Sequence, residues 1–233
     1  MPVAEDILAG ARKGRRADAE ALLAEHYPLI CRMARGLAGS DDYARGVLRF
    51  VMSHAMQNVQ HWRDPDAVER WFVHQTVLTR RRTADRAPDP RADLLVGDAS
   101  SDPPYVAFVR AVRTLSPQQR EAFLLHHGER WTVRQVAVAM DCSTQATEMH
   151  LRLAQQSLTT VAGNDYSRLM NRLVATYASL TPSAQATLQT ASRYAARNLL
   201  PSRIRRWSVA VLIGLILATI VWVVLKLRAS GHL

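Results

Sequence analysis

The sequence predicts an all-α protein, and its composition supports this class in two ways. Aromatic residues make up 6% of the 233 residues, and the chain has 10 glycines and 10 prolines. This composition lacks the frequent turns and the β-branched or aromatic runs of an all-β protein. Alanine, leucine, arginine and glutamine dominate the long segments, and these residues favour helix. Because 48% of the residues are hydrophobic and 21% are charged, the chain has enough apolar surface to bury a core.

Three helices are expected in a first domain, residues 1–83, because apolar positions recur at near-helical spacing between turn signals. The expected helices cover residues 17–35, 43–59 and 67–82. The second has Asp41 and Asp42 at the positive end of its dipole. The third follows Asp64-Pro65, which marks a turn and a helix start.

A flexible linker is expected over residues 84–104. The segment holds five aspartates and four prolines and shows little periodicity. Such a composition favours an extended connection over a packed helix. A second domain is expected over residues 105–161.

The second domain contains a predicted helix-turn-helix. Thr132 caps a short helix over 133–140, and a turn over 141–143 leads into a longer helix over 144–161. Ala137 provides the small side chain that is needed where the two helices cross. The outward positions of the second helix, which enter the major groove in DNA-binding examples of this motif, are Thr144, Gln145, Glu148, Met149 and Arg152. Helical hairpins without a DNA role show the same pattern, so spacing alone leaves both interpretations open.

The positive charge of the chain lies in its last third. The net charge is +10, and residues 166–233 hold nine of the 30 basic residues and no acidic one. Residues 207–225 form an uncharged apolar run; as a helix it would span about 28 Å, close to the bilayer core of about 30 Å. The run predicts a C-terminal transmembrane helix, with a buried core helix as the alternative.

The predicted topology is tail-anchored. Residues 162–206 would form a basic juxtamembrane helical segment that meets anionic membrane lipid, and residues 226–233 a short tail. Basic residues are more frequent before the run than after it, and residues 1–16 contain no apolar run of signal-peptide length. We therefore expect a single-pass protein of the inner (cytoplasmic) membrane with its N-terminal domains in the cytoplasm.

Two stretches resemble bacterial RNA polymerase sigma factors of the extracytoplasmic-function type. Residues 115–158 resemble region 4 of that family, and residues 21–82 resemble region 2. The matching positions of the first stretch are Leu115, Pro117, Arg120, Phe123, Leu124, Ala137, Ser143, Leu151 and Leu158. The comparable positions of the second are Tyr27, Pro28, Asp41, Asp42, Trp62, Trp71 and Phe72. The resemblance implies two sigma-like helical domains, the second of which reads promoter DNA through its helix-turn-helix.

The resemblance also implies partners and site residues. Core RNA polymerase is expected to contact the region 2-like helix at Asp41, Asp42, Arg45 and Arg49. Promoter DNA is expected to contact Arg80, Arg81, Arg82 and Arg134, together with the five outward residues of the helix-turn-helix. An anti-sigma or other regulatory protein is a further expected partner.

Two functions remain open at this point. The first is a membrane-tethered, sigma-like regulator of transcription initiation. The second is a degenerate sigma-like module, anchored to the membrane, that binds a protein and does not initiate transcription. Arg45 and Gly46 stand where the family has acidic residues, and Arg152 is the one permanent positive charge on the second helix of the motif. Both departures weaken charge-dependent binding and favour the second function.

No enzyme activity, cofactor or metal is expected. The sequence contains no P-loop, zinc-protease or nucleophile-elbow motif. The histidines do not fall at metal-ligand spacing. Cys31 and Cys142 are far apart in the sequence and are expected to be reduced thiols.

Overall fold

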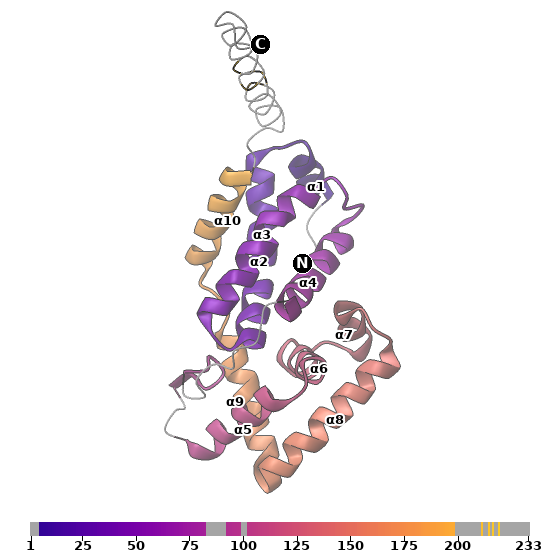
Figure 1. Cartoon of the computed structure of the whole chain (residues 1–233), viewed down its shortest axis with the longest axis vertical. Helices are drawn as coiled ribbons and strands as arrows, with labels where there is room; N and C mark the ends of the chain where they lie inside the picture. Colours follow the sequence, from indigo (N-terminus) through magenta and orange to yellow (C-terminus); the bar gives the residue numbers. More distant parts are fainter. Residues whose placement is uncertain are drawn as a thin grey trace, which may run out of the picture.

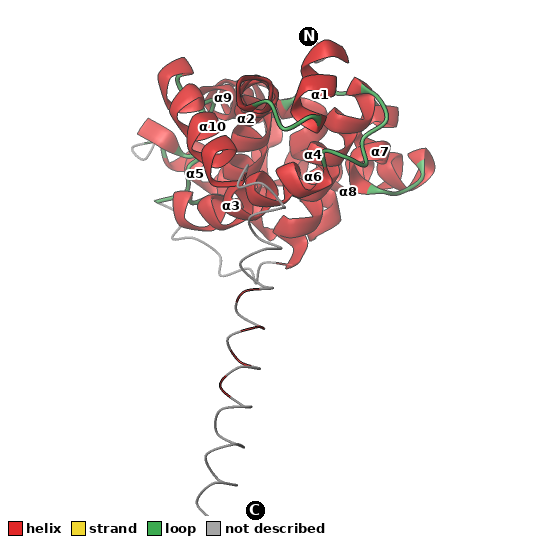
Figure 2. Ribbon diagram, turned by 90° about the horizontal axis from the view of Figure 1, so that it is seen from above, coloured by secondary structure: helices red, strands yellow, loops and turns green. Residues whose placement is uncertain are grey.

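The computed structural model describes residues 5–82, 92–98 and 102–198, and four separate residues at 211, 214, 216 and 219. Within these ranges the chain is helical and has no strand (Figure 2). The helices are α1 (Glu5–Arg12), α2 (Arg16–Ala38), α3 (Asp41–Asn58), α4 (Pro65–Arg82), α5 (Pro103–Thr114), α6 (Pro117–Gly128), α7 (Val133–Met140), α8 (Thr144–Ala162), α9 (Tyr166–Ser179) and α10 (Ala184–Asn198). This part of the chain therefore has the expected α-class architecture.

The helices α1 to α4 form one group, and α10 lies along α2 within it (Figure 1). The turn after α2 depends on Gly39, whose φ of 75° closes the helix with a backbone hydrogen bond of 2.8 Å. This left-handed conformation favours glycine. Ser40 then caps α3, because its hydroxyl accepts from the backbone N–H of Tyr43. Small buried residues on α10, Ala191 and Ala195, allow this helix to pack closely on the group.

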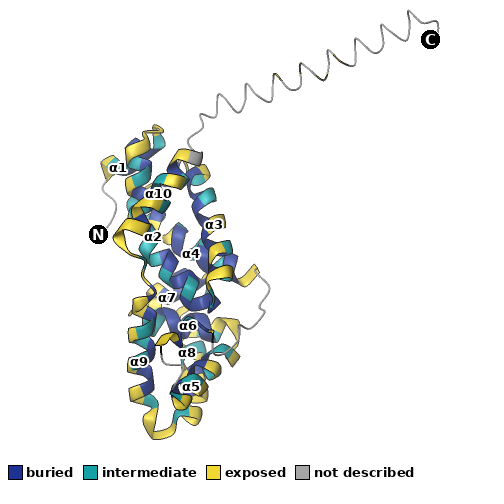
Figure 3. Ribbon diagram, turned by 90° about the vertical axis from the view of Figure 1, so that its left-hand side faces the viewer, coloured by how far each residue is buried: buried dark blue, intermediate teal, exposed yellow. Residues whose placement is uncertain are grey.

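The helices α5 to α9 form a second group around a large apolar cluster. Four of these helices begin at a capping residue whose side chain accepts a hydrogen bond from the backbone N–H three residues later. The capping residues are Asp102, Ser116, Thr132 and Ser143. The large side chains buried in the cluster include Tyr105, Phe108, Phe123, Leu158 and Tyr177. Figure 3 shows the buried faces of the helices turned toward one another and the exposed faces turned outward.

The two groups share part of one core. Met33 and Leu37 from α2, and Val73 and Val77 from α4, belong to the same buried cluster as the side chains of α5 to α9. The two helix groups are therefore packed against each other directly.

Residues 92–98 of the expected linker are also packed. Leu95 and Val96 are buried, and the carboxylate of Asp93 accepts two hydrogen bonds from the Arg113 guanidinium at 2.6 and 2.9 Å. The phenol of Tyr105 donates to the carbonyl oxygen of Leu95 at 2.8 Å. The composition predicted a flexible linker, whereas the contacts with Arg113 and Tyr105 hold residues 92–98 against the second helix group.

The segment expected to lie beside a membrane forms α9 and α10, which pack on the other helices. Arg168 and Arg172 of α9 pair with Asp102, and the Arg172 guanidinium lies 4.9 Å from the centre of the Tyr105 ring. Asp102 belongs to the expected linker, so acidic charge from that stretch neutralises part of the basic excess.

The prediction of a C-terminal transmembrane helix is wrong for the part of the chain that the structure describes. No helix there is both long enough and apolar enough to cross a bilayer. The long helices each combine an apolar face with a charged or polar one, whereas a helix surrounded by lipid must be apolar over most of its surface. This finding overturns the predicted single-pass location in the inner membrane. Residues 207–225 themselves lie outside the described residues, apart from Val211, Gly214, Ile216 and Thr219.

Candidate nucleic-acid interface

The helices α7 and α8 form a helix-turn-helix, with boundaries within one residue of those expected from the sequence. Thr132 and Gln135 form a reciprocal capping box at the start of α7. Asp141 ends α7 with a φ of 54°, and the N–H of Cys142 donates to the Ala137 carbonyl at 3.0 Å. Ser143 then caps α8 through a hydrogen bond of 3.1 Å from the N–H of Ala146. Local polar groups therefore make this turn tight and fix the direction of α8.

The motif is held by small and apolar side chains on its inner surface. Ala137 is 3% exposed, as expected for the small residue at the helix crossing, and Ala154 and Leu158 are fully buried. Thr147 is also fully buried, and its hydroxyl donates to the Ser143 carbonyl at 3.1 Å. The sequence interpretation missed Thr147, although its helical spacing from Leu151, Ala154 and Leu158 places it on the inner face.

The five residues predicted to face DNA lie on the solvent side of α8. They are Thr144, Gln145, Glu148, Met149 and Arg152, and all of them are exposed. Leu153 on the same helix is 39% exposed, and Val138 on α7 is 51% exposed. The surface of the motif is thus polar with apolar side chains interspersed. The DNA contacts of the five residues remain a prediction, and Arg134 on α7 is exposed as that prediction requires.

The three arginines that end α4 are in different environments. The Arg80 side chain is buried, and its Nε donates to the Leu37 carbonyl oxygen at 3.2 Å. Arg81 pairs with Glu121 of α6, at 2.6 Å between Nη2 and Oε2. Arg82 is exposed. In this conformation two of the three predicted DNA contacts bind other parts of the protein.

The ion pair between Arg81 and Glu121 lies at the junction of the two helix groups. The Glu121 carboxylate is 4% exposed, and burial raises its pKa, an effect that the hydrogen bonds from Arg81 oppose. The hydrogen bonds to Glu121 also raise the pKa of Arg81. The Arg81 side chain is 30% exposed, so solvent contacts the arginine of this pair, whereas the Glu121 side chain is buried.

The four residues predicted to contact polymerase lie on the exposed side of α3, at its start and along its first turns. Arg35 of α2 pairs with Asp41 at 2.8 Å, and Arg45 pairs with Asp42 at 2.6 Å. Exposed pairs of this kind contribute about 0–1 kcal/mol, so a binding partner can replace them at little cost. Arg49 is exposed one turn further along α3.

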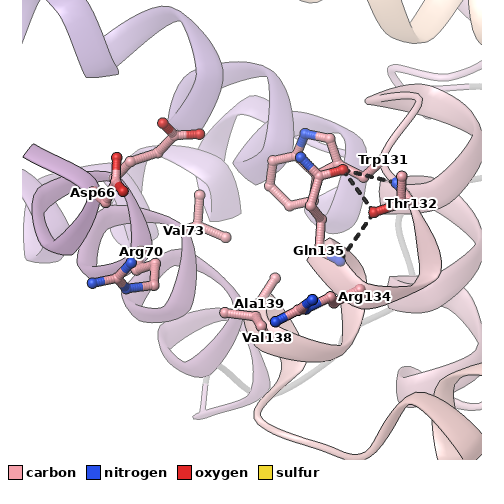
Figure 4. Close-up of a pocket in the computed structure, with 10 residues that line it drawn as sticks. Asp66, Arg70, Val73, Trp131, Thr132, Arg134, Gln135, Val138 and Ala139 are labelled. Carbon is pink, nitrogen blue, oxygen red and sulfur yellow. Dashed lines mark hydrogen bonds between the residues drawn. The ribbon is translucent and has the colours of Figure 1, made fainter. Parts of the chain in front are cut away.

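A cleft of about 370 Å³ lies between α4 and α7 (Figure 4). Its walls include Asp66, Glu69 and Arg70 from α4 and Arg134 from α7, with Val73 between the two helices. Local sequence signals do not predict this cleft, because its two walls are about 65 residues apart in the chain and meet only in the tertiary structure.

Comparison with known proteins identifies the family of one part of the chain. Residues 105–158 match the family Sigma-70, region 4. This match supports a sigma-factor-like protein, and Sigma-70 region 4 is a family of DNA-binding regulatory domains. The chain has no significant match among curated proteins or solved structures. The matched residues cover most of α5, all of α6 and α7, and most of α8, so they include the whole turn between α7 and α8.

Proposed function

We propose that the protein is a sigma-factor-like regulator of transcription initiation that binds core RNA polymerase and promoter DNA. The observation that carries the proposal is the helix-turn-helix of α7 and α8, which lies within the region 4 match and leaves its outward face exposed. In this motif the N-terminal part of the second helix reads base edges, while the first helix crosses the phosphate backbone.

Four of the predicted DNA contacts have side chains whose chemistry fits a specific role. Gln145 and Glu148 lie in the first turns of α8, where an amide pairs with adenine and a carboxylate accepts from the cytosine amino group. Arg152 and Arg134 supply positive charge for phosphate oxygens. Because so few cations face the DNA, we expect the isolated protein to bind weakly and the polymerase complex to supply most of the affinity.

Polymerase binding is proposed at Asp41, Asp42, Arg45 and Arg49 of α3. The resemblance of residues 21–82 to sigma region 2, and the exposure of these four side chains, support this assignment. Assignment to the extracytoplasmic-function type rests on the same resemblance and is part of the proposal.

The test is transcription by the full chain with core RNA polymerase of the source organism on fragmented genomic DNA of that organism. We expect the protein to co-purify with core polymerase and to produce discrete transcripts. Arg152→Ala should reduce transcript yield, whereas Arg110→Ala, which removes an exposed arginine from α5, should leave it unchanged. Absence of both co-purification and transcripts would refute the proposal.

A second candidate function is a sigma-like protein-binding module that does not initiate transcription. It is favoured by the exposure of Met149 (44%), Leu153 (39%) and Val138 (51%) on the motif, because apolar side chains suit a protein partner better than a phosphate backbone. This candidate predicts that Met149→Lys abolishes capture of a regulatory protein, and that polymerase subunits are never recovered with the unmodified chain.

A further inference from the structure

Tyr177 of α9 is fully buried between the two helix groups. Its ring lies against the backbone of Gly36 in α2 on one side and of Gly128 in α6 on the other. A Cβ atom on Gly128 would lie 2.7 Å from the ring, and a Cβ on Gly36 would overlap it more severely. The ring therefore occupies a slot that exists because both neighbours are glycine.

The hydroxyl of Tyr177 joins a polar network that links the same helices. It donates to Glu129 Oε1 at 2.9 Å, and Arg32 of α2 donates to both oxygens of this carboxylate, with an Nε–Oε1 distance of 2.9 Å. Arg32 also donates to the Thr181 hydroxyl, just after α9, at 2.9 Å. Burial, followed by the charge of Glu129, raises the pKa of Tyr177 well above its usual value. The end of α9 thus ties α2 to the residue that follows α6.

This packing holds the candidate DNA-binding groups in unfavourable positions. Arg81 is paired with Glu121 across the junction. Asp66 and Glu69 of α4 line the same cleft as Arg134 of α7, and Figure 4 shows Asp66 on the wall opposite Arg134. Because the first helix of the motif crosses the phosphate backbone, carboxylates beside it oppose DNA binding electrostatically.

We propose that Tyr177 is the clasp of a closed form of this protein that binds DNA weakly. While the ring fills its slot, α9 holds the region 4 helices against α2 and α4. Release of the ring lets the two groups separate, which frees Arg81 and moves the α4 carboxylates away from α7. The DNA part of this inference rests on the proposed function, and the clasp itself does not. Two ion pairs, Arg81 with Glu121 and Arg32 with Glu129, cross the junction beside the shared apolar cluster.

The decisive variant is Tyr177→Ala in the full chain. Its matched control is Tyr166→Ala, which removes the same side chain from the other end of α9, where the ring packs edge-on against Phe108 within the region 4 group. Small-angle X-ray scattering measures the separation of the groups, and fluorescence anisotropy measures binding to a 30-base-pair DNA duplex of mixed sequence. Circular dichroism reports whether each variant is folded.

We expect Tyr177→Ala to increase the radius of gyration and to tighten DNA binding by about five-fold at low salt. The slope of the logarithm of the binding constant against the logarithm of the salt concentration should become steeper by roughly one for each added phosphate contact. Tyr166→Ala should change neither quantity. A folded Tyr177→Ala protein with an unchanged radius of gyration would overturn the clasp. Expansion without tighter DNA binding would support the clasp and contradict the proposed DNA-binding function.

A second variant covers the case in which Tyr177→Ala loses its helical circular dichroism. Glu129→Gln keeps the size of the side chain and removes the charge that Arg32 and Tyr177 bind. The same expansion is then expected to a smaller degree, and its absence in folded Glu129→Gln overturns the proposal.

Discussion

Burial of His26 should make the stability of this protein depend on pH. The His26 ring is 6% exposed and stacks on Phe72 with 4.7 Å between ring centroids. Its Nε2 atom is buried and has no hydrogen-bond partner among the described residues. Burial lowers its pKa from 6.5 to about 4, since a charged imidazolium is poorly solvated in this apolar position.

The sign of the effect follows from the lowered pKa. The unfolded chain binds a proton at His26 at higher pH than the folded chain does, so unfolding becomes more favourable as pH falls below 6.5. The contribution is fully present above that pH and is lost progressively toward pH 4. At pH 5 the loss is about 2 kcal/mol, on the basis of 1.36 kcal/mol for each pKa unit.

Urea unfolding at pH 8 and pH 5 measures this loss when the full chain is compared with His26→Leu. Leucine keeps an apolar side chain at the site and does not titrate, so the pH-dependent loss should be about 2 kcal/mol smaller in the variant. The control is His61→Leu, because His61 is exposed and should leave the difference between the two pH values unchanged. Equal pH dependence in the unmodified protein and His26→Leu would refute this reasoning.

Three further substitutions test the junction and the interior of α3. Gly128→Ala should lower the free energy of unfolding by about 2 kcal/mol, because its Cβ would collide with the Tyr177 ring; Gly46→Ala in α3, where a Cβ meets nothing within 4 Å, should raise it by about 0.5–1 kcal/mol. Urea denaturation distinguishes the two variants. Destabilisation of equal size at both sites would contradict the inference that the Tyr177 ring requires glycine at position 128. Glu121→Ala should cost about 2 kcal/mol, less than the 3–5 typical of a fully buried pair because the Arg81 side chain reaches solvent. A loss below 0.5 kcal/mol in the same assay would show that the pair is not part of the stable junction.

The sequence predicted the helix-turn-helix closely because its signals are local. Thr132 and Ser143 act on backbone N–H groups three residues away, and a helix repeats every 3.6 residues. The same local reasoning placed Ala137 at the helix crossing and the five outward residues of α8 on the exposed face. Such features depend on neighbours within one or two helical turns.

Reasoning from local sequence failed where it inferred which partner a charged or apolar segment contacts. The arginines at the end of α4 were expected to face DNA, yet Arg80 and Arg81 bind Leu37 and Glu121, which are about 40 residues away in sequence. The predicted membrane anchor came from an apolar run and its basic flanks, most of which lie outside the described residues, and no helix in the described part of the chain fits it. Sequence shows that a side chain is charged or apolar, whereas the packed fold determines what that side chain contacts.

The sequence by itself determined the α class, the approximate boundaries of α2, α3, α4, α7 and α8, and the outward face of α8, because capping and periodicity act over a few residues. Only the tertiary structure decided that α9 and α10 pack back on the earlier helices, and that residues 36, 128 and 177 meet in one slot. That slot requires two glycines and a tyrosine from three helices to be brought within van der Waals contact. Only the folded chain makes such a contact, because its members are separated by 49 or more positions along the sequence.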